Sequence, residues 1–245
     1  MAIPSKGFFE KGMQQLRTDL RLGGAAISIE LRTKLGQNLA LALLGGFRGV
    51  VANFVWVGVY TAYQEQHWHK VKERAELTVV LQPHSVSFWD LGAWHMAYNS
   101  SFAESINFKY PTRAYRLKIQ RDWIMAGKKF LEEGIQNNPD RYELYLALGR
   151  IIYDPYKLND PLGSIHHLKK AASYPGAPLY IVRMIGHMYT KGGKTHEAYE
   201  WWKQLWAQDH EKNPAQLWDK IAQWGHETEE KLGIPVRERV FPSKS

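Results

Sequence analysis

Apolar residues recur every three or four positions along most of this chain, a spacing that predicts amphipathic helices. The clearest example lies between Pro178 and Pro214. Its first helix gathers apolar side chains on one face, namely Leu179, Val182, Ile185, Met188 and Tyr189. The segment 191–194 then supplies glycines for a left-handed helix end and lysines for the negative end of the helix. Thr195 follows as the predicted N-cap of a second helix. The pattern therefore predicts two helices joined by a tight turn.

Small and large residues alternate where these two helices are expected to cross. Gly186 allows a close approach, Ala198 is small at the crossing point, and Trp202 fills the space beyond. Together with Tyr189, these residues fall at offsets that resemble the tetratricopeptide (TPR) motif. Because one such unit cannot bury its own apolar face, the resemblance implies neighbouring units of the same kind.

Weaker copies of the pattern precede this pair. The sequence predicts a first repeat in residues 49–64 and 68–81. A second begins at Ser85 and resumes in residues 121–139. Between its two helices, residues 100–120 are rich in aromatic and basic side chains, and we expect them to form an inserted loop.

A third copy and a terminal helix complete the pattern. The third repeat is expected around residues 145–152 and 164–175, with a long connector that contains two Asp-Pro steps. Residues 215–232 then predict a capping helix with a more polar outer face. Its inward side chains are expected to be Leu217, Ile221 and Trp224. The tail from Gly233 onward is expected to be extended.

These patterns predict an all-α protein, a TPR-like α-solenoid of antiparallel helix pairs. Residues 1–48 are expected to form N-terminal amphipathic and hydrophobic helices. Residues 49–232 would hold about four repeats plus the capping helix. Residues 233–245 would form the tail.

A more specific resemblance rests on the LGGFRG-type stretch and the tryptophans after it. The chain is similar to uncharacterised bacterial TPR proteins that share this opening. The matching positions are Leu44 to Gly49, Trp56, Leu81 to Pro83, Trp89, Ala93-Trp94 and Ala97 to Asn99. Proteins of that kind carry a membrane helix before the motif, whereas we expect none before Leu44 here. The resemblance implies neither an enzymatic activity nor a ligand.

The N-terminal sixty residues leave a membrane contact open. Residues 8–22 predict a basic amphipathic helix, and residues 27–35 a second short amphipathic piece. Residues 38–60 form an apolar run long enough to span a bilayer, although Arg48 and Asn53 would be costly there. The run therefore predicts either buried solenoid helices or a membrane-inserted or membrane-lying segment. No cleavable signal peptide is seen, so the expected location is cytoplasmic or membrane-associated.

Composition and motifs argue against several functions. The chain has no cysteine, which excludes disulfides, thiolate metal sites and cysteine nucleophiles. His196-Glu197 begins like a zinc-protease helix, but Glu200 stands where the second histidine is needed. No phosphate-binding glycine loop or nucleophile elbow occurs. We therefore expect no catalytic site, cofactor or metal. The net charge of +8 alone suggests nucleic acid, which we do not favour because Lys and Arg are scattered along the chain.

Binding of another protein is the preferred hypothesis, with two candidate surfaces. The first is the concave groove of a solenoid, whose predicted partner-binding residues are Trp89, Met96, Arg150, Tyr153, Arg183, His187 and Thr190. The second is the insertion, with Phe108, Tyr110, Arg113, Tyr115 and Arg116. Arginine pairs carboxylates bidentately and aromatic side chains anchor interfaces. The predicted function is a non-catalytic scaffold, an accessory subunit of a larger assembly. Three alternatives remain: the groove positions hold ordinary solvated residues, Phe108 and Tyr110 of the insertion cover the core, or the chain is a peripheral membrane protein that contacts lipid through residues 1–60.

Overall fold

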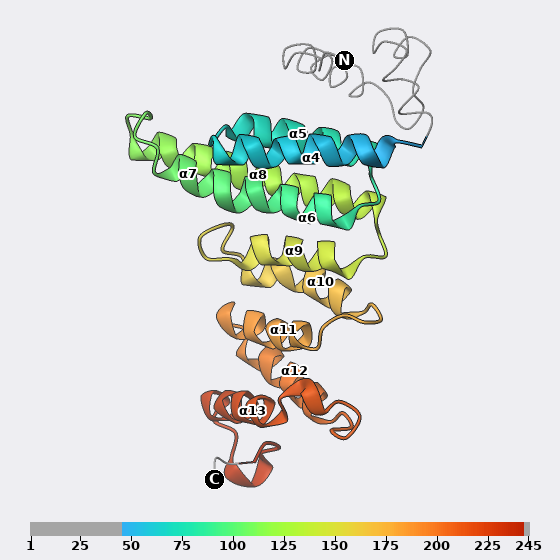
Figure 1. Ribbon diagram of the computed structural model, residues 1–245. Coiled ribbons are helices and arrows are strands. Elements are labelled where there is room, and N and C mark those ends of the chain that lie inside the picture. Colours follow the sequence, from blue (N-terminus) through green and yellow to red (C-terminus); the bar gives the residue numbers. More distant parts are fainter. Residues whose placement is uncertain (1–45, 243–245) are drawn as a thin grey trace, which may run out of the picture. The chain divides into compact units, whose positions relative to one another are not determined.

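The computed structural model describes residues 46–242, and all regular secondary structure in this part of the chain is helical (Figure 1). It divides into two compact units between Gly92 and Ala93, within helix α6 (Val86–Trp94). The predicted all-α class is thereby confirmed for these residues. The helices predicted in residues 8–22 and 27–35 lie outside the described part.

The first unit contains a close pair of antiparallel helices, α4 (Arg48–Gln64) and α5 (Trp68–Leu81). Both match the predicted bounds to within one residue. Small and β-branched side chains bury the seam between them, and these are Ala52, Val55, Val59, Ala62, Val71, Ala75 and Val79. Arg74 donates a hydrogen bond to the backbone carbonyl of Gly58, which ties α5 back to α4. Gln66, with φ of 55°, takes the left-handed conformation in the turn between them.

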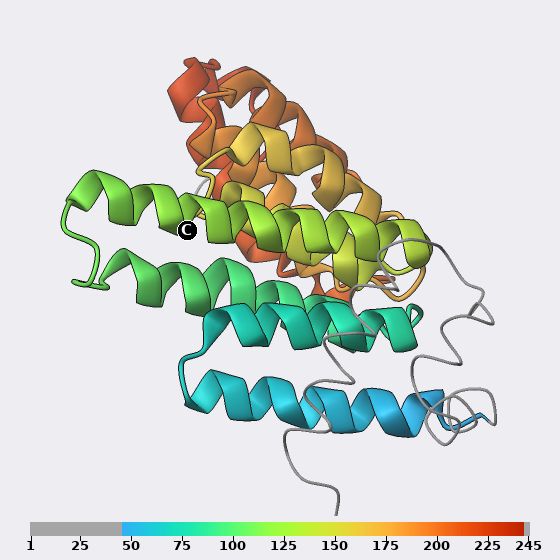
Figure 2. The same ribbon diagram turned by 90° about the horizontal axis from the view of Figure 1, so that it is seen from above.

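The second unit begins with a long helical hairpin, and here the predicted insertion is wrong. Helix α6 continues through a π-helical stretch (His95–Ser100) into α7 (Ser101–Ser105). The chain returns in α8 (Arg113–Asn137), so only residues 106–112 form a loop. The two arms approach closely at Gly127, where a Cβ would lie 2.8 Å from the Cβ of Ala97. Figure 2 shows this loop at the end of the hairpin.

The next pair consists of α9 (Tyr142–Tyr153) and α10 (Pro161–Ala172), as predicted. Asp160 caps α10 because its carboxylate accepts a 2.8 Å hydrogen bond from the backbone N–H of Gly163. Pro161 occupies the first turn, where its missing N–H costs nothing. Buried side chains from α9, α10 and α11 then form one cluster, which contains Leu146, Ile165, Leu168, Ala171, Ile181, Ile185 and Met188.

The pair α11 (Tyr180–Lys191) and α12 (Thr195–Trp206) has the close crossing that the sequence predicts. A Cβ on Gly186 would lie 2.3 Å from the ring of Trp202, which is 1% exposed. The turn is a Schellman motif, because Lys194 N–H donates to Tyr189 C=O and Gly193 adopts φ of 73°. Thr195 is not the N-cap, since Lys194 holds that position without a side-chain hydrogen bond.

Helix α13 (Trp218–Leu232) begins later than predicted. Leu217 precedes it in a left-handed conformation, with φ of 59°, and is 53% exposed, so its predicted inward position is wrong. Ile221 is fully buried, as expected. The preceding residues form the short helix η2 (Pro214–Gln216).

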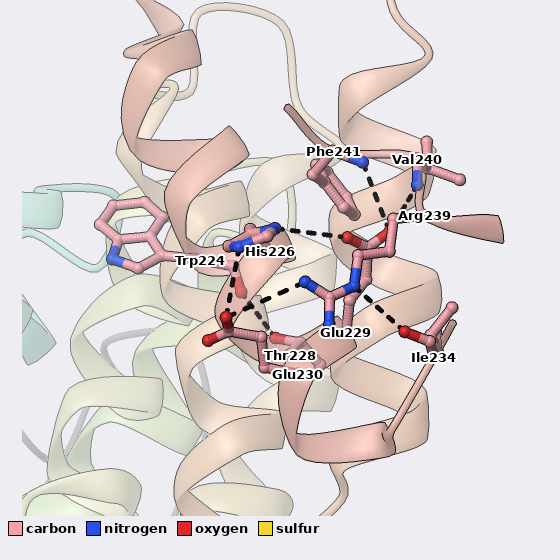
Figure 3. A network of polar contacts seen from close by, with 9 residues as sticks. All are labelled: Trp224, His226, Thr228, Glu229, Glu230, Ile234, Arg239, Val240 and Phe241. Atoms are coloured by element: carbon pink, nitrogen blue, oxygen red, sulfur yellow. Dashed lines mark hydrogen bonds and ion pairs between the residues drawn. The ribbon is translucent and has the colours of Figure 1, made fainter. Parts of the chain in front are cut away.

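The tail is attached to α13 through a buried glutamate (Figure 3). Glu229 is fully buried, and its Oε1 accepts hydrogen bonds from the backbone N–H of Val240 at 2.6 Å and of Phe241 at 3.3 Å. The ring of Phe241 packs over Gly225, where a Cβ would lie 2.4 Å from it. A single turn, η3 (Val236–Glu238), interrupts the otherwise extended tail.

Candidate interaction surfaces

Two of the predicted groove residues are not on a surface. Met96 is fully buried and Trp89 is 4% exposed. The indole N–H of Trp89 donates a 2.7 Å hydrogen bond to the carbonyl of Pro83. Both side chains therefore stabilise the fold, and their assignment as partner-binding residues is corrected. The sequence correctly predicted that both residues are helical, but it wrongly predicted that their side chains face solvent.

The groove residues of α9 reach towards α11. Arg150 is exposed, and its guanidinium donates a 2.9 Å hydrogen bond to the hydroxyl of Tyr180. Tyr153 is half-buried, and the ammonium of Lys191 lies 6.0 Å from its ring centroid. We call the surface formed by Arg150, Tyr153, Tyr180 and Lys191 the α9–α11 face. Tyr180 and Lys191 were not predicted as site residues. They are the first and last residues of α11, and their spacing gives no sign that both lie near α9.

The groove residues of α11 reach in turn towards η2 and α13. Arg183 donates hydrogen bonds to the backbone carbonyl of Gln216 at 3.1 Å and to its side-chain oxygen at 2.7 Å. His187 lies against two indoles, with ring centroids 5.3 Å from Trp202 and 4.4 Å from Trp224. Burial lowers the pKa of His187, and the neighbouring charges of Lys191 and Arg183 lower it further.

Arg183 and His187 therefore have structural partners, which leaves less of their surface for a ligand. Thr190 is exposed at the end of α11, where its hydroxyl donates a 3.1 Å hydrogen bond to the carbonyl of Gly186. Of the predicted groove residues, Arg150 presents its charge most openly, and Tyr153 lies beside it on the same helix. The α9–α11 face can offer arginine and lysine to a carboxylate and tyrosine rings to an apolar side chain.

The predicted insertion residues do come together, at the end of the α7–α8 hairpin. We call residues 102–121 the hairpin tip. Phe108 is 86% exposed in the connecting loop. The guanidinium of Arg116 lies 5.3 Å from its ring centroid and donates a 2.9 Å hydrogen bond to the carbonyl of Tyr110. The rings of Tyr110 and Tyr115 lie 5.2 Å apart, and Arg113 is exposed in the first turn of α8.

The structure adds apolar residues that sequence reasoning missed. Phe102 and Ile106, on the α7 side of the hairpin tip, are 62% and 53% exposed, and Leu117 on α8 is 49% exposed. Their spacing could have revealed them, because residues four apart lie on one helical face. An expected loop has no helical faces, which is why the pattern of the sequence did not single them out.

A separate apolar stripe lies on α4 and its N-cap residue in the first unit. Its exposed side chains are Phe47, Val50, Phe54, Val57 and Tyr60. Steps of three and four residues place them along one side of the helix. Five large apolar side chains on one helix side exceed the scattered exposure that is normal for a surface.

Neither metal coordination nor a membrane span emerges from the described residues. Within 46–242, no three His, Asp or Glu side chains gather as metal ligands would. In the same part of the chain, no helix combines the length and apolar character needed to cross a bilayer. The described residues include α4, and with it most of the apolar run 38–60 for which a membrane segment was one of the alternatives.

Comparison with known proteins adds no relative. No family model matches this chain, no curated protein resembles it significantly, and no solved structure does either.

Proposed function

We propose that this chain is a TPR-like solenoid that acts as a non-catalytic scaffold and binds a protein partner as an accessory subunit of a larger assembly. Consecutive helix pairs, α9–α10 and α11–α12, support the repeat architecture. Each pair crosses at a glycine of its first helix: Gly149 faces Leu168 and Gly186 faces Trp202. A glycine thus faces a large side chain in both pairs, and this recurrence supports a repeated unit.

The α9–α11 face is the observation that carries the proposal. On this face, α9 and α11 present the exposed Arg150 and Lys191 beside the half-buried rings of Tyr153 and Tyr180. Tyrosine and arginine are enriched among the residues that contribute most to binding at protein interfaces, because tyrosine gives a large contact area and arginine directed hydrogen bonds. The basic side chains favour an acidic segment of the partner.

Isolation of the native assembly tests the proposal. The full-length chain, tagged in its native host, is isolated intact and analysed by native mass spectrometry. We expect a defined complex that dissociates when Arg150→Glu and Lys191→Glu are combined. The matched control combines Lys129→Glu and Lys212→Glu, whose side chains are 78% and 79% exposed, and keeps the same change of net charge. A free monomer at cellular concentration, or equal losses in both double variants, contradicts the proposal.

The stripe on α4 favours a second candidate function, a peripheral membrane protein that contacts lipid through residues 1–60. Its apolar side chains could lie at the boundary between headgroups and acyl chains. Flotation of the full-length chain with anionic liposomes tests this idea, with Phe54→Ser and Val57→Ser as the paired change. Loss of flotation in that variant supports it, whereas a wild-type chain that stays with the soluble fraction refutes it.

A further inference from the structure

The hairpin tip combines exposed apolar side chains with a concentration of positive charge. Its basic residues are Lys109, Arg113, Arg116, Lys118 and Arg121, and its only acidic residue is Glu104. Glu104 accepts a 2.9 Å hydrogen bond from the side-chain amide of Asn107. No ion pair within the described residues joins a basic side chain of the tip to a carboxylate. The tip therefore carries an excess of positive charge, and Asp122, directly after it, is the nearest further carboxylate along α8.

The fold holds this part of the chain away from the packed core of the second unit. Helix α8 has 25 residues and α9, which packs against it, has 12. At a rise of about 1.5 Å per residue, α8 is about 37 Å long and α9 about 18 Å. The buried side chains of α8 begin at Trp123, so its first turns carry none. The hairpin thus extends beyond the helix that supports it (Figure 2).

The exposed apolar and basic side chains gather around the loop at the end of the hairpin. Phe108 occupies the loop, where it is the most exposed large apolar residue of the described chain at 86%. Phe102 and Ile106 flank it on one arm, four residues apart. On the other arm Arg113, Leu117 and Arg121 follow one another at helical spacing and are all exposed. The basic residues thus lie in the loop and on the α8 arm, whereas the α7 arm contributes the apolar side chains.

We propose that the hairpin tip is a docking site for an anionic lipid surface, into which Phe108, Ile106 and Leu117 insert while the arginines and lysines contact the headgroups. Each basic residue near such a surface is attracted to the anionic headgroups, and each apolar side chain that leaves water makes the binding free energy more favourable. The proposal is independent of the scaffold function and of the α4 stripe.

The shape and chemistry favour lipid over the other classes of partner. A folded protein would have to provide a pocket for a projecting hairpin end, whereas a bilayer interface accepts one without a matching shape. Single-stranded nucleic acid would use the basic residues and the phenylalanine ring, but the aliphatic side chains of Ile106 and Leu117 lack the aromatic face on which bases stack. Insertion into a membrane interface uses every exposed residue type at the tip.

A single fluorescent label tests the insertion directly. Because the natural chain has no cysteine, Phe108→Cys creates a unique site for the environment-sensitive dye NBD. The full-length labelled chain is mixed with vesicles of phosphatidylcholine and phosphatidylserine, and with vesicles of phosphatidylcholine alone. We expect a blue shift and brighter emission only with the anionic vesicles. The same dye at Lys129→Cys, in the part of α8 that carries buried side chains, is expected to show unchanged emission with both kinds of vesicle.

Charge variants then locate the binding. Lys109→Gln combined with Arg113→Gln should weaken vesicle binding roughly thirty-fold, since each neutralised residue contributes about five-fold. Lys129→Gln combined with Lys212→Gln removes the same net charge elsewhere and should change binding less than about three-fold if the tip is the site. All four side chains lie on the surface, so helical circular dichroism should be unchanged.

Several results would overturn the proposal. Unchanged NBD emission at position 108 in the presence of anionic vesicles would mean that the tip does not insert, even if the vesicles bind elsewhere on the chain. Equal weakening by the two charge pairs would mean attraction by net charge only. If Phe54→Ser with Val57→Ser abolishes binding and the tip variants do not, lipid contact belongs to the first unit. A label that responds to single-stranded RNA or to an acidic protein, but not to vesicles, would make the tip a site for that partner instead.

Discussion

The crossing of α11 and α12 makes a quantitative prediction at Gly186. A Cβ there would lie 2.3, 2.4 and 2.6 Å from three ring atoms of Trp202. Ordinary van der Waals contact begins near 3.4 Å, so the indole would have to move by about 1 Å. It is 1% exposed and lies against His187 and Trp224, with ring centroids at 5.3 Å in both cases. Gly186→Ala therefore forces a shift that the surrounding rings resist.

The expected cost follows from two opposed effects. Overpacking of a tight core costs about 1–3 kcal/mol, and the upper half of that range applies because the obstacle is a rigid ring. Alanine is better than glycine inside a helix by about 1 kcal/mol. We therefore expect Gly186→Ala to lower the free energy of unfolding by about 1–2 kcal/mol. Guanidinium chloride unfolding, followed by far-ultraviolet circular dichroism, measures the change.

Two further variants separate this contact from other effects. Gly149→Ala is the matched control, because the nearest atom to its Cβ, at 2.9 Å, is a terminal methyl carbon of Leu168 that can rotate away. Its effect should be close to zero. In the background of Trp202→Phe, which lacks the second ring, Gly186→Ala should lose most of its cost. A neutral or stabilising Gly186→Ala in the natural background would refute the reasoning.

Other predictions concern the tail, the pH dependence and the link between α11 and η2. Glu229→Ala leaves the backbone N–H groups of residues 240 and 241 without an acceptor, so it should cost about 1–3 kcal/mol and speed their hydrogen exchange; unchanged exchange at both amides would contradict this. The pKa of His187 is lowered in the folded protein, so unfolding binds a proton and stability should fall as the pH drops below its ordinary value of 6.5. His187→Gln should reduce that dependence in melts across this range, with His95 and His167, whose pKa values burial also lowers, accounting for what remains, and an unaltered slope would argue against it. Arg183→Met should cost about 1–3 kcal/mol, since Gln216 is 2% exposed and loses its donor; a variant as stable as the natural chain would show that this bond contributes nothing.

Much of the fold follows from local patterns in the sequence. The bounds of α4 and α5 could be predicted to within one residue because apolar periodicity and the closing Pro83 agree there, whereas α9 and α12 were predicted as helices but not with their exact ends. The role of Gly186 was also predictable, since a tryptophan ring can pack directly against a helix backbone only where the helix carries no side chain. Such agreement between local signals makes a helix pair predictable from its residues.

The long hairpin was missed because its polar residues resemble a helix end. Ser100 and Ser101 donate hydroxyl hydrogen bonds to the carbonyls of His95 and Ala97, at 2.9 and 2.5 Å, and so remain inside the helix. Sequence rules treat such serines, together with Asn99, as signs of a turn. The orientation of groove residues was harder still, because the burial of Met96 depends on contacts between helices that no local pattern encodes.

Photo-crosslinking in living cells tests the central claim, that the α9–α11 face binds a protein partner. A photoreactive amino acid replaces Arg150 in the full-length chain, and in a parallel variant it replaces Lys129 on α8. Light should join position 150 to one protein, which is lost when Lys191→Glu is added, and should leave position 129 without an adduct. The absence of any adduct from position 150, or the same adducts from both positions, would contradict the claim.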